Sequence, residues 1–182
     1  MKQMRIDTSF LSLDAADLSI EEKILLERAW AACEMAYAPY SGFQVGVALL
    51  LDNGEVIEGA NQENAAYPMC ICAEPVALSR AKVQFPQAKI RWMAIRVKNR
   101  ARPALEPAAP CGACRQIISE YEGRQGAPIG LLLQGQEGQV YKFNEIAPLL
   151  PSFEHRSGRP RSRGPVPARH PEHGAPPPPS RC

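Results

Sequence analysis

The first clear pattern of apolar positions along the chain is helical. Residues 20–37 place apolar side chains at helical spacing, and Ser19 with Glu22 forms a capping-box pattern just before them. We expect a helix there that ends before Pro39. Its inner face should be formed by Ile20, Ile24, Leu25, Trp30 and Cys33.

Strands and further helices are predicted to follow in alternation. Residues 43–51 are apolar and typical of a buried strand, and the turn at 52–54 leads into a second strand over 55–59. Such interleaving predicts an α/β fold with helices covering the sheet. The remaining expected elements are helices over 73–83 and 111–121, strands over 90–97, 129–133 and 140–143, and a short helix over 144–150.

Both ends of the chain depart from this pattern. Residues 1–18 show little periodicity and are expected to form a loosely ordered arm. Residues 154–182 contain eight prolines and almost no apolar side chains, so they cannot bury enough surface to offset the entropy of ordering. We predict one domain over 19–153 and a disordered Pro/Arg-rich tail over 154–182. A lost reading frame near residue 152 would produce the same change of composition.

Charge is distributed unevenly between these parts. The tail carries six arginines against two glutamates, whereas residues 1–153 carry 15 basic and 17 acidic residues. The folded part lacks the basic surface of a nucleic-acid-binding domain, which disfavours nucleic acid as a partner. The N-terminus has no signal-peptide pattern, and the apolar run over 45–51 is far shorter than the roughly 20 residues that span a bilayer. The sequence predicts a cytoplasmic protein without a membrane segment.

The distribution of cysteine and histidine indicates one kind of metal site. Any transition-metal site in the domain must use thiolate or carboxylate ligands, because all three histidines lie in the tail, at His155, His170 and His173. Cys72 stands two residues before Glu74, and Cys111 and Cys114 form a C-x-x-C pair. Three thiols from two places can build an open zinc site whose fourth position is left for water.

The cysteines should stand at the starts of two helices. Cys72 precedes one expected helix, and Cys111 and Cys114 lie in the first turn of the next. Helix N-termini favour anions and lower thiol pKa values. A carboxylate beside such a metal, here Glu74, can accept a proton from water and deliver it to a leaving group.

These motifs resemble those of the small, homotetrameric cytidine deaminases. Cys72-Ala73-Glu74 together with residues 110–116 matches the three-cysteine form of the zinc deaminase signature. Residues 38–46, 61–68 and 149–151 are similar to further motifs of that family, in the same order. The resemblance spans about residues 20–153.

The resemblance implies a fold, an assembly and a reaction. The fold would be a three-layer α-β-α arrangement around a five-stranded mixed sheet, and the assembly a homotetramer with active sites at subunit contacts. The reaction would be hydrolysis of cytidine and deoxycytidine to uridine and deoxyuridine with release of ammonia, a step of pyrimidine salvage. One zinc ion per chain would be held by Cys72, Cys111 and Cys114, with Glu74 as proton shuttle.

The same resemblance implies how a nucleoside would be held. Asn61 and Glu63 would bind a ribose hydroxyl, and Phe43 would stack near the base. The backbone of Ala73 would contact the pyrimidine.

Two departures from the family pattern stand out. Pro75 occupies the position where the family usually has an arginine that offsets thiolate charge, although Arg115 remains. The family's C-terminal aromatic, which reaches an adjacent active site, has Phe153 as its only candidate here. Altered rate or altered substrate choice would follow from either departure.

Alternative functions keep the zinc but change its use. The protein could deaminate another aminopyrimidine compound, such as a nucleoside antibiotic. A fourth thiol such as Cys70 could close the site and make a non-enzymatic zinc-binding module. A C-x-x-C redox protein and a polynucleotide deaminase are disfavoured, the first by the third thiol and the second by the acidic domain.

Overall fold

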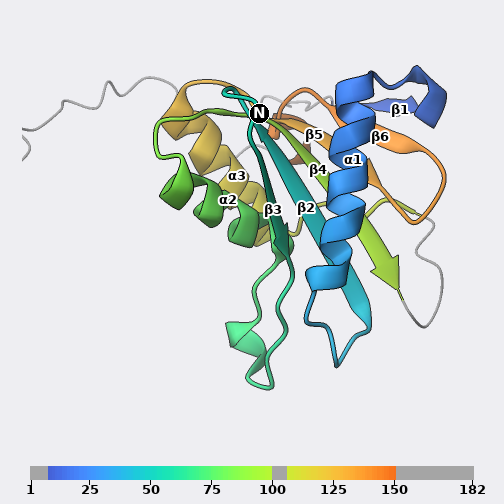
Figure 1. The fold of residues 1–182 in the computed structure, drawn as a ribbon, viewed down its shortest axis with the longest axis vertical. Coiled ribbons are helices and arrows are strands. Elements are labelled where there is room, and N and C mark those ends of the chain that lie inside the picture. Colours follow the sequence, from blue (N-terminus) through green and yellow to red (C-terminus); the bar gives the residue numbers. More distant parts are fainter. Residues whose placement is uncertain (1–7, 100–105, 151–182) are drawn as a thin grey trace, which may run out of the picture.

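The computed structural model describes residues 8–99 and 106–150, which form one mixed sheet with helices on both faces (Figure 1). The strand order is β1-β6-β5-β4-β2-β3, with β4 and β5 parallel and the other neighbours antiparallel. The strands are β1 (Leu11–Leu13), β2 (Phe43–Leu51), β3 (Val56–Ala60), β4 (Ile90–Asn99), β5 (Gly130–Gln134) and β6 (Val140–Phe143). The helices are α1 (Ile20–Ala32), α2 (Ala73–Gln84) and α3 (Gly112–Gln125), with 3-10 turns at Ala15–Asp17, Cys33–Met35, Tyr67–Met69 and Ala147–Leu149.

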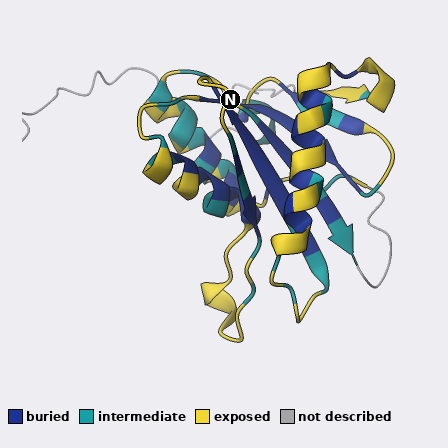
Figure 2. Ribbon diagram, in the orientation of Figure 1, coloured by how far each residue is buried: buried dark blue, intermediate teal, exposed yellow. Residues whose placement is uncertain are grey.

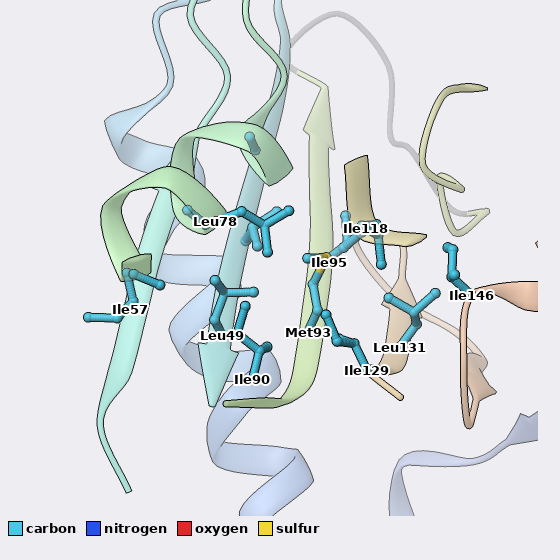
Figure 3. Packing of buried hydrophobic residues seen from close by; sticks show 14 of the residues in the cluster. Leu49, Ile57, Leu78, Ile90, Met93, Ile95, Ile118, Ile129, Leu131 and Ile146 are labelled. Atoms are coloured by element: carbon cyan, nitrogen blue, oxygen red, sulfur yellow. The ribbon is translucent and has the colours of Figure 1, made fainter. Parts of the chain in front are cut away.

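Strand β2 shows why the sheet is covered on both faces. Successive side chains of a strand point to opposite faces, and both sets in β2 are apolar. Val47, Leu49 and Leu51 belong to the core shared with α2 and α3 (Figure 3). Ala48 and Leu50 belong to a second core that also contains residues of α1. The expected three-layer α/β fold is therefore confirmed, and the middle of the sheet is buried, whereas β2 and β4 are partly exposed toward their ends (Figure 2).

The prediction of a five-stranded sheet is wrong, because the sheet has six strands. Strand β1 lies within the segment expected to be a loosely ordered arm, and it pairs antiparallel with β6, Leu11 opposite Lys142. The ring of Phe10 lies 4.9 Å from that of Tyr141 and 5.0 Å from that of Phe143. A three-residue strand has too little local pattern to be recognised, because partners far along the chain determine it.

Helix α1 begins as expected but faces the sheet differently. Ser19 caps it, and the capping box with Glu22 is confirmed. The helix ends at Ala32 rather than continuing to residue 37. The predicted inner face is right for Leu25 and Cys33, which are buried, but wrong for Ile20 and Ile24, which are 77% and 51% exposed. The buried face of the helix is formed by Leu25, Leu26, Ala29 and Ala32.

A close approach between α1 and β2 explains the change of face. A Cβ on Gly46 would lie 2.1 Å from the carbonyl oxygen of Ala29, so only small side chains fit between helix and strand. The larger Leu25 and Leu26 pack in the core that also contains Ala48 and Leu50, and the isoleucines of the first turns are exposed.

Helix α2 approaches the sheet just as closely at Gly59 of β3. A Cβ there would lie 2.6 Å from the amide nitrogen of Ala77 and 2.9 Å from the carbonyl oxygen of Ala73. These are backbone atoms of a packed helix, so they cannot move aside without displacing the helix.

We therefore predict that Gly59→Ala destabilises the protein by about 2 kcal/mol, the usual range for overpacking a core. Thermal denaturation would measure this as a fall in Tm of several degrees. Gly123→Ala is the matched control, since Gly123 lies in α3 with nothing within 4 Å of an added Cβ. It should be neutral or stabilising because alanine favours helix, and an equal fall in both variants would contradict the packing argument.

Phe153 and the predicted tail over 154–182 lie outside the described residues, so the domain limit at 153 stays a prediction. The limit at 19 also stays a prediction, although strand β1, which precedes it, pairs with β6 of the sheet. Within residues 8–99 and 106–150, no helix has both the length and the apolar character needed to cross a bilayer.

Candidate active site

Three cysteine sulfurs converge where helices α2 and α3 begin. Cys72 is the N-cap residue of α2, Cys111 is the N-cap residue of α3, and Cys114 lies in the first turn of α3. The Sγ atoms of Cys111 and Cys114 are 3.3 Å apart, those of Cys72 and Cys111 are 3.9 Å apart, and all three lie within 4.8 Å of one another. The structure thus brings together the cysteines that the sequence selected.

The donor set fits zinc. Sulfur ligands about 2.3 Å from one tetrahedral ion lie roughly 3.8 Å from each other, and the separations in this cluster bracket that value. Two helix N-termini also direct their positive ends at the cluster, which favours thiolates there. The three cysteines could therefore hold a metal ion without a change of backbone.

The thiol groups of Cys72 and Cys114 influence each other's pKa. The hydrogen bond with Cys114 lowers the pKa of Cys72 to about 6. That same contact, followed by burial, raises the pKa of Cys114. Ionisation of one of these two thiols thus opposes ionisation of the other, and a divalent cation bound between them would offset that repulsion.

Glu74 is the second residue of α2 and lies next to the cysteine cluster. It is only 5% exposed, and burial raises the pKa of its carboxyl group, with hydrogen bonds to its own backbone and to Cys114 opposing that rise. A carboxyl group whose pKa is raised holds a proton more readily than an exposed one, which suits a group that transfers protons. Its position agrees with the proton-transfer function expected from the sequence.

A cavity of about 370 Å³ opens beside the cluster. Such a volume is in the range of small-molecule sites. Its lining includes six residues singled out from the sequence: Phe43, Asn61, Glu63, Cys72, Glu74 and Cys111. Sequence reasoning did not assign a substrate contact to eight others, which are Ser41, Val45, Gln62, Cys70, Ile71, Ile95, Ala108 and Ala109.

Ala73 and Cys114 differ from the other predicted site residues in their relation to the cavity. Both side chains are buried, and neither lines the cavity. The expected contact of Ala73 with a pyrimidine concerns its backbone, and the residue opens α2 between Cys72 and Glu74. That contact stays a prediction.

Asn61 and Glu63 are hydrogen-bonded to residues of the segment 40–45. The Asn61 side chain accepts from Val45 N at 2.8 Å and donates to Phe43 O at 3.0 Å. Glu63 accepts from Tyr40 N at 2.9 Å and from Ser41 Oγ at 2.5 Å. The hydrogen bond from Ser41 lowers the pKa of Glu63, so this carboxylate is ionised at neutral pH.

Cys70 does not belong to the cysteine cluster. Its Sγ atom accepts from Asn64 N at 3.2 Å, and the cluster found among the described residues contains Cys72, Cys111 and Cys114 alone. The arrangement therefore gives no support to a site closed by a fourth thiolate from Cys70.

Comparison with known proteins identifies the family. A model of the cytidine and deoxycytidylate deaminase zinc-binding region matches residues 19–125. The cytidine deaminase of Halalkalibacterium halodurans is 44% identical over 101 residues, which are 56% of this chain and 72% of that protein. The cytidine deaminase of Sporosarcina psychrophila is 41% identical over 100 residues, 55% of this chain and 68% of that protein.

Solved structures give a matching result. The crystal structure of cytidine deaminase from Burkholderia pseudomallei aligns with a TM-score of 0.62 and 36% identity, covering 74% of this chain and 98% of that one. The structure of cytidine deaminase from Mycobacterium leprae aligns with a TM-score of 0.55 and 28% identity, covering 74% of this chain and 100% of that one.

Proposed function

Because the chain belongs to the cytidine and deoxycytidylate deaminase family, we propose that it hydrolyses cytidine and deoxycytidine to uridine and deoxyuridine with release of ammonia. The observation that carries this proposal is the cluster of three cysteine sulfurs beside the buried Glu74 at one cavity. The same chemistry on a different aminopyrimidine has no separate feature of the structure in its favour.

Cys72, Cys111 and Cys114 would hold one zinc ion per chain. When bound there, zinc supplies the Lewis acidity that makes water a nucleophile at neutral pH. Glu74 would take one proton from the attacking water and pass it to the ring nitrogen, which keeps that proton in the product. It would then carry the second proton of the same water to the departing amino group. Burial of Glu74 supports this function, because a raised pKa lets the carboxyl group hold each proton between its uptake and its release.

The charge of the cavity supports a nucleoside rather than a nucleotide as substrate. Among the described residues that line it, two are acidic and none is lysine or arginine. A phosphate group would find no lysine or arginine among these described lining residues and would be repelled by Glu63. Phe43, Asn61 and Glu63 would then face the neutral base and sugar of the nucleoside.

An assembly of several copies, for which the family suggests a homotetramer, is also proposed. The 3-10 turn at Tyr67–Met69 projects from the body of the protein (Figure 2), and Tyr67 and Met69 are 71% and 63% exposed. Exposed apolar groups of this kind mark interaction sites, and the exposed side chain of Ile71 extends this apolar surface to the cavity.

We also propose a function in pyrimidine salvage in the cytoplasm. A reducing compartment suits this site, because its three cysteines must stay reduced to bind zinc.

Pro75 allows a test of charge at the metal centre. We predict that Pro75→Arg raises kcat by up to about tenfold, since it adds the positive charge that three thiolates around a divalent ion lack. The backbone should tolerate the change, because the first N–H groups of a helix need no intrahelical partner. Pro75→Gln is the uncharged control, and equal rates in both variants and the parent would contradict the argument.

Product analysis tests the proposed reaction itself. Zinc-loaded protein is incubated with cytidine, deoxycytidine or deoxycytidine 5′-monophosphate, and products are separated by chromatography while ammonia is measured. We expect both nucleosides to yield ammonia in equal amount with the deaminated product, and the nucleotide to react at least about tenfold more slowly. Faster reaction of the nucleotide, or no reaction of either nucleoside, would contradict the proposal.

A further inference from the structure

Ser41 connects two other residues that line the cavity, Glu63 and Phe43, through its hydroxyl group. Its Oγ atom donates to Glu63 Oε1 at 2.5 Å and accepts from the backbone N–H of Phe43 at 2.9 Å. Its own backbone N–H donates to Glu63 Oε2 at 3.3 Å, and so does that of Tyr40, at 2.9 Å. Ser41, Phe43 and Glu63 all line the cavity.

The hydrogen-bonding capacity of Ser41 and Glu63 shows which of the two can still bind a ligand. A hydroxyl group has a single proton, and that of Ser41 is engaged by Glu63. A carboxylate offers about four acceptor positions, of which Glu63 has three occupied by residues 40 and 41. A short O–H···O⁻ contact is among the stronger hydrogen bonds. Glu63 is thus held in one orientation and keeps an acceptor position for a ligand.

The backbone around Ser41 depends on this connection. Gly42 adopts a positive φ of 65°, which turns the chain sharply between Ser41 and Phe43. Asn61 fixes the next stretch through Phe43 O and Val45 N. Ser41 is therefore the side chain that ties the turn before Phe43 to the carboxylate on the opposite segment, 22 residues later.

We propose that Ser41 is a positioning residue for sugar recognition: it holds Glu63 and the backbone of Phe43 in the arrangement that a sugar hydroxyl requires. This inference rests on the proposed function, since it assumes a nucleoside in the cavity. Ser41 acts through Glu63 and does not itself donate to the substrate. Its removal should weaken binding of ligands that carry sugar hydroxyls and leave other ligands unaffected.

Two inhibitors that differ only in the sugar test this proposal. Uridine and 2′,3′-dideoxyuridine are measured as competitive inhibitors of cytidine turnover by the zinc-loaded parent, Ser41→Ala and Ser41→Thr. We expect Ser41→Ala to raise the inhibition constant of uridine about fivefold and that of dideoxyuridine less than about twofold, since one charge-assisted hydrogen bond is lost. Ser41→Thr keeps the hydroxyl group, and Ser41 is exposed, so uridine binding should be restored.

The outcomes separate this inference from the proposed function. Absence of cytidine turnover in the parent would reject the proposed function and this inference with it. Turnover in the parent with equal changes for both inhibitors in Ser41→Ala, or with no change for either, would reject Ser41 as a positioning residue alone. Ser79→Ala, an exposed serine of α2 that does not line the cavity, controls for general effects of losing a hydroxyl group.

Discussion

Replacing Glu74 by glutamine should lower kcat by at least about a thousandfold while zinc stays bound, within the range that positioned general acids and bases contribute. Glutamine keeps the shape of the side chain but cannot shuttle a proton. Because Glu74 is not a ligand in the proposed site, the zinc content of the variant should match that of the parent. Steady-state kinetics and elemental analysis on the same sample would measure both quantities.

Folding stability distinguishes lost catalysis from lost structure in this variant. Burial raises the pKa of Glu74 in the folded protein. The ionised carboxylate therefore destabilises the fold at pH values above the pKa that Glu74 has in the unfolded chain. Metal-free Glu74→Gln should therefore melt no lower than the metal-free parent at neutral pH. Glu55→Gln, on an exposed turn, is the control that should keep full activity. Loss of zinc together with activity would contradict a proton-transfer function.

Replacing Cys111 by serine should weaken zinc binding at least about a hundredfold, because a thiolate ligand is lost. Serine is a favoured N-cap residue, so α3 should still begin at the same position, where Cys111 now accepts from the amide of Cys114. Zinc content after dialysis against a weak chelator, with circular dichroism to follow the helix, would measure the two effects separately.

Cys70→Ser is the matched control for zinc content. Cys70 is also an exposed cysteine near the site, but its sulfur is hydrogen-bonded to the backbone of Asn64 and lies outside the cluster. Its replacement should leave about one zinc per chain in place. A loss of zinc in Cys70→Ser as great as in Cys111→Ser would mean that Cys70 is a fourth ligand and the site is closed.

The candidate metal centre could be predicted from sequence because each half of it is local. Cys111 and Cys114 are one helical turn apart, and Cys72 stands two residues before Glu74, so spacing alone fixes how each pair is presented. The continuous apolar run of β2 likewise indicated a strand buried on both faces. These features depend on neighbours along the chain, which a sequence displays directly.

Other features depend on contacts that local pattern does not contain. Strand β1 is fixed by pairing with β6, more than a hundred residues later. The orientation of α1 is fixed by the contact at Gly46, which turns Ile20 outward. The hydrogen bonds of Glu63 with Tyr40 and Ser41 form between segments that only the folded sheet brings together.

Titration of metal-free protein with zinc, with loss of cytidine absorbance followed after each addition, tests the central claim most directly. If the three cysteines hold the ion that activates water beside Glu74, turnover should rise in proportion to added zinc and level off at about one equivalent per chain. Full turnover before zinc is added would contradict this account. So would a protein that binds one equivalent of zinc and leaves cytidine unchanged.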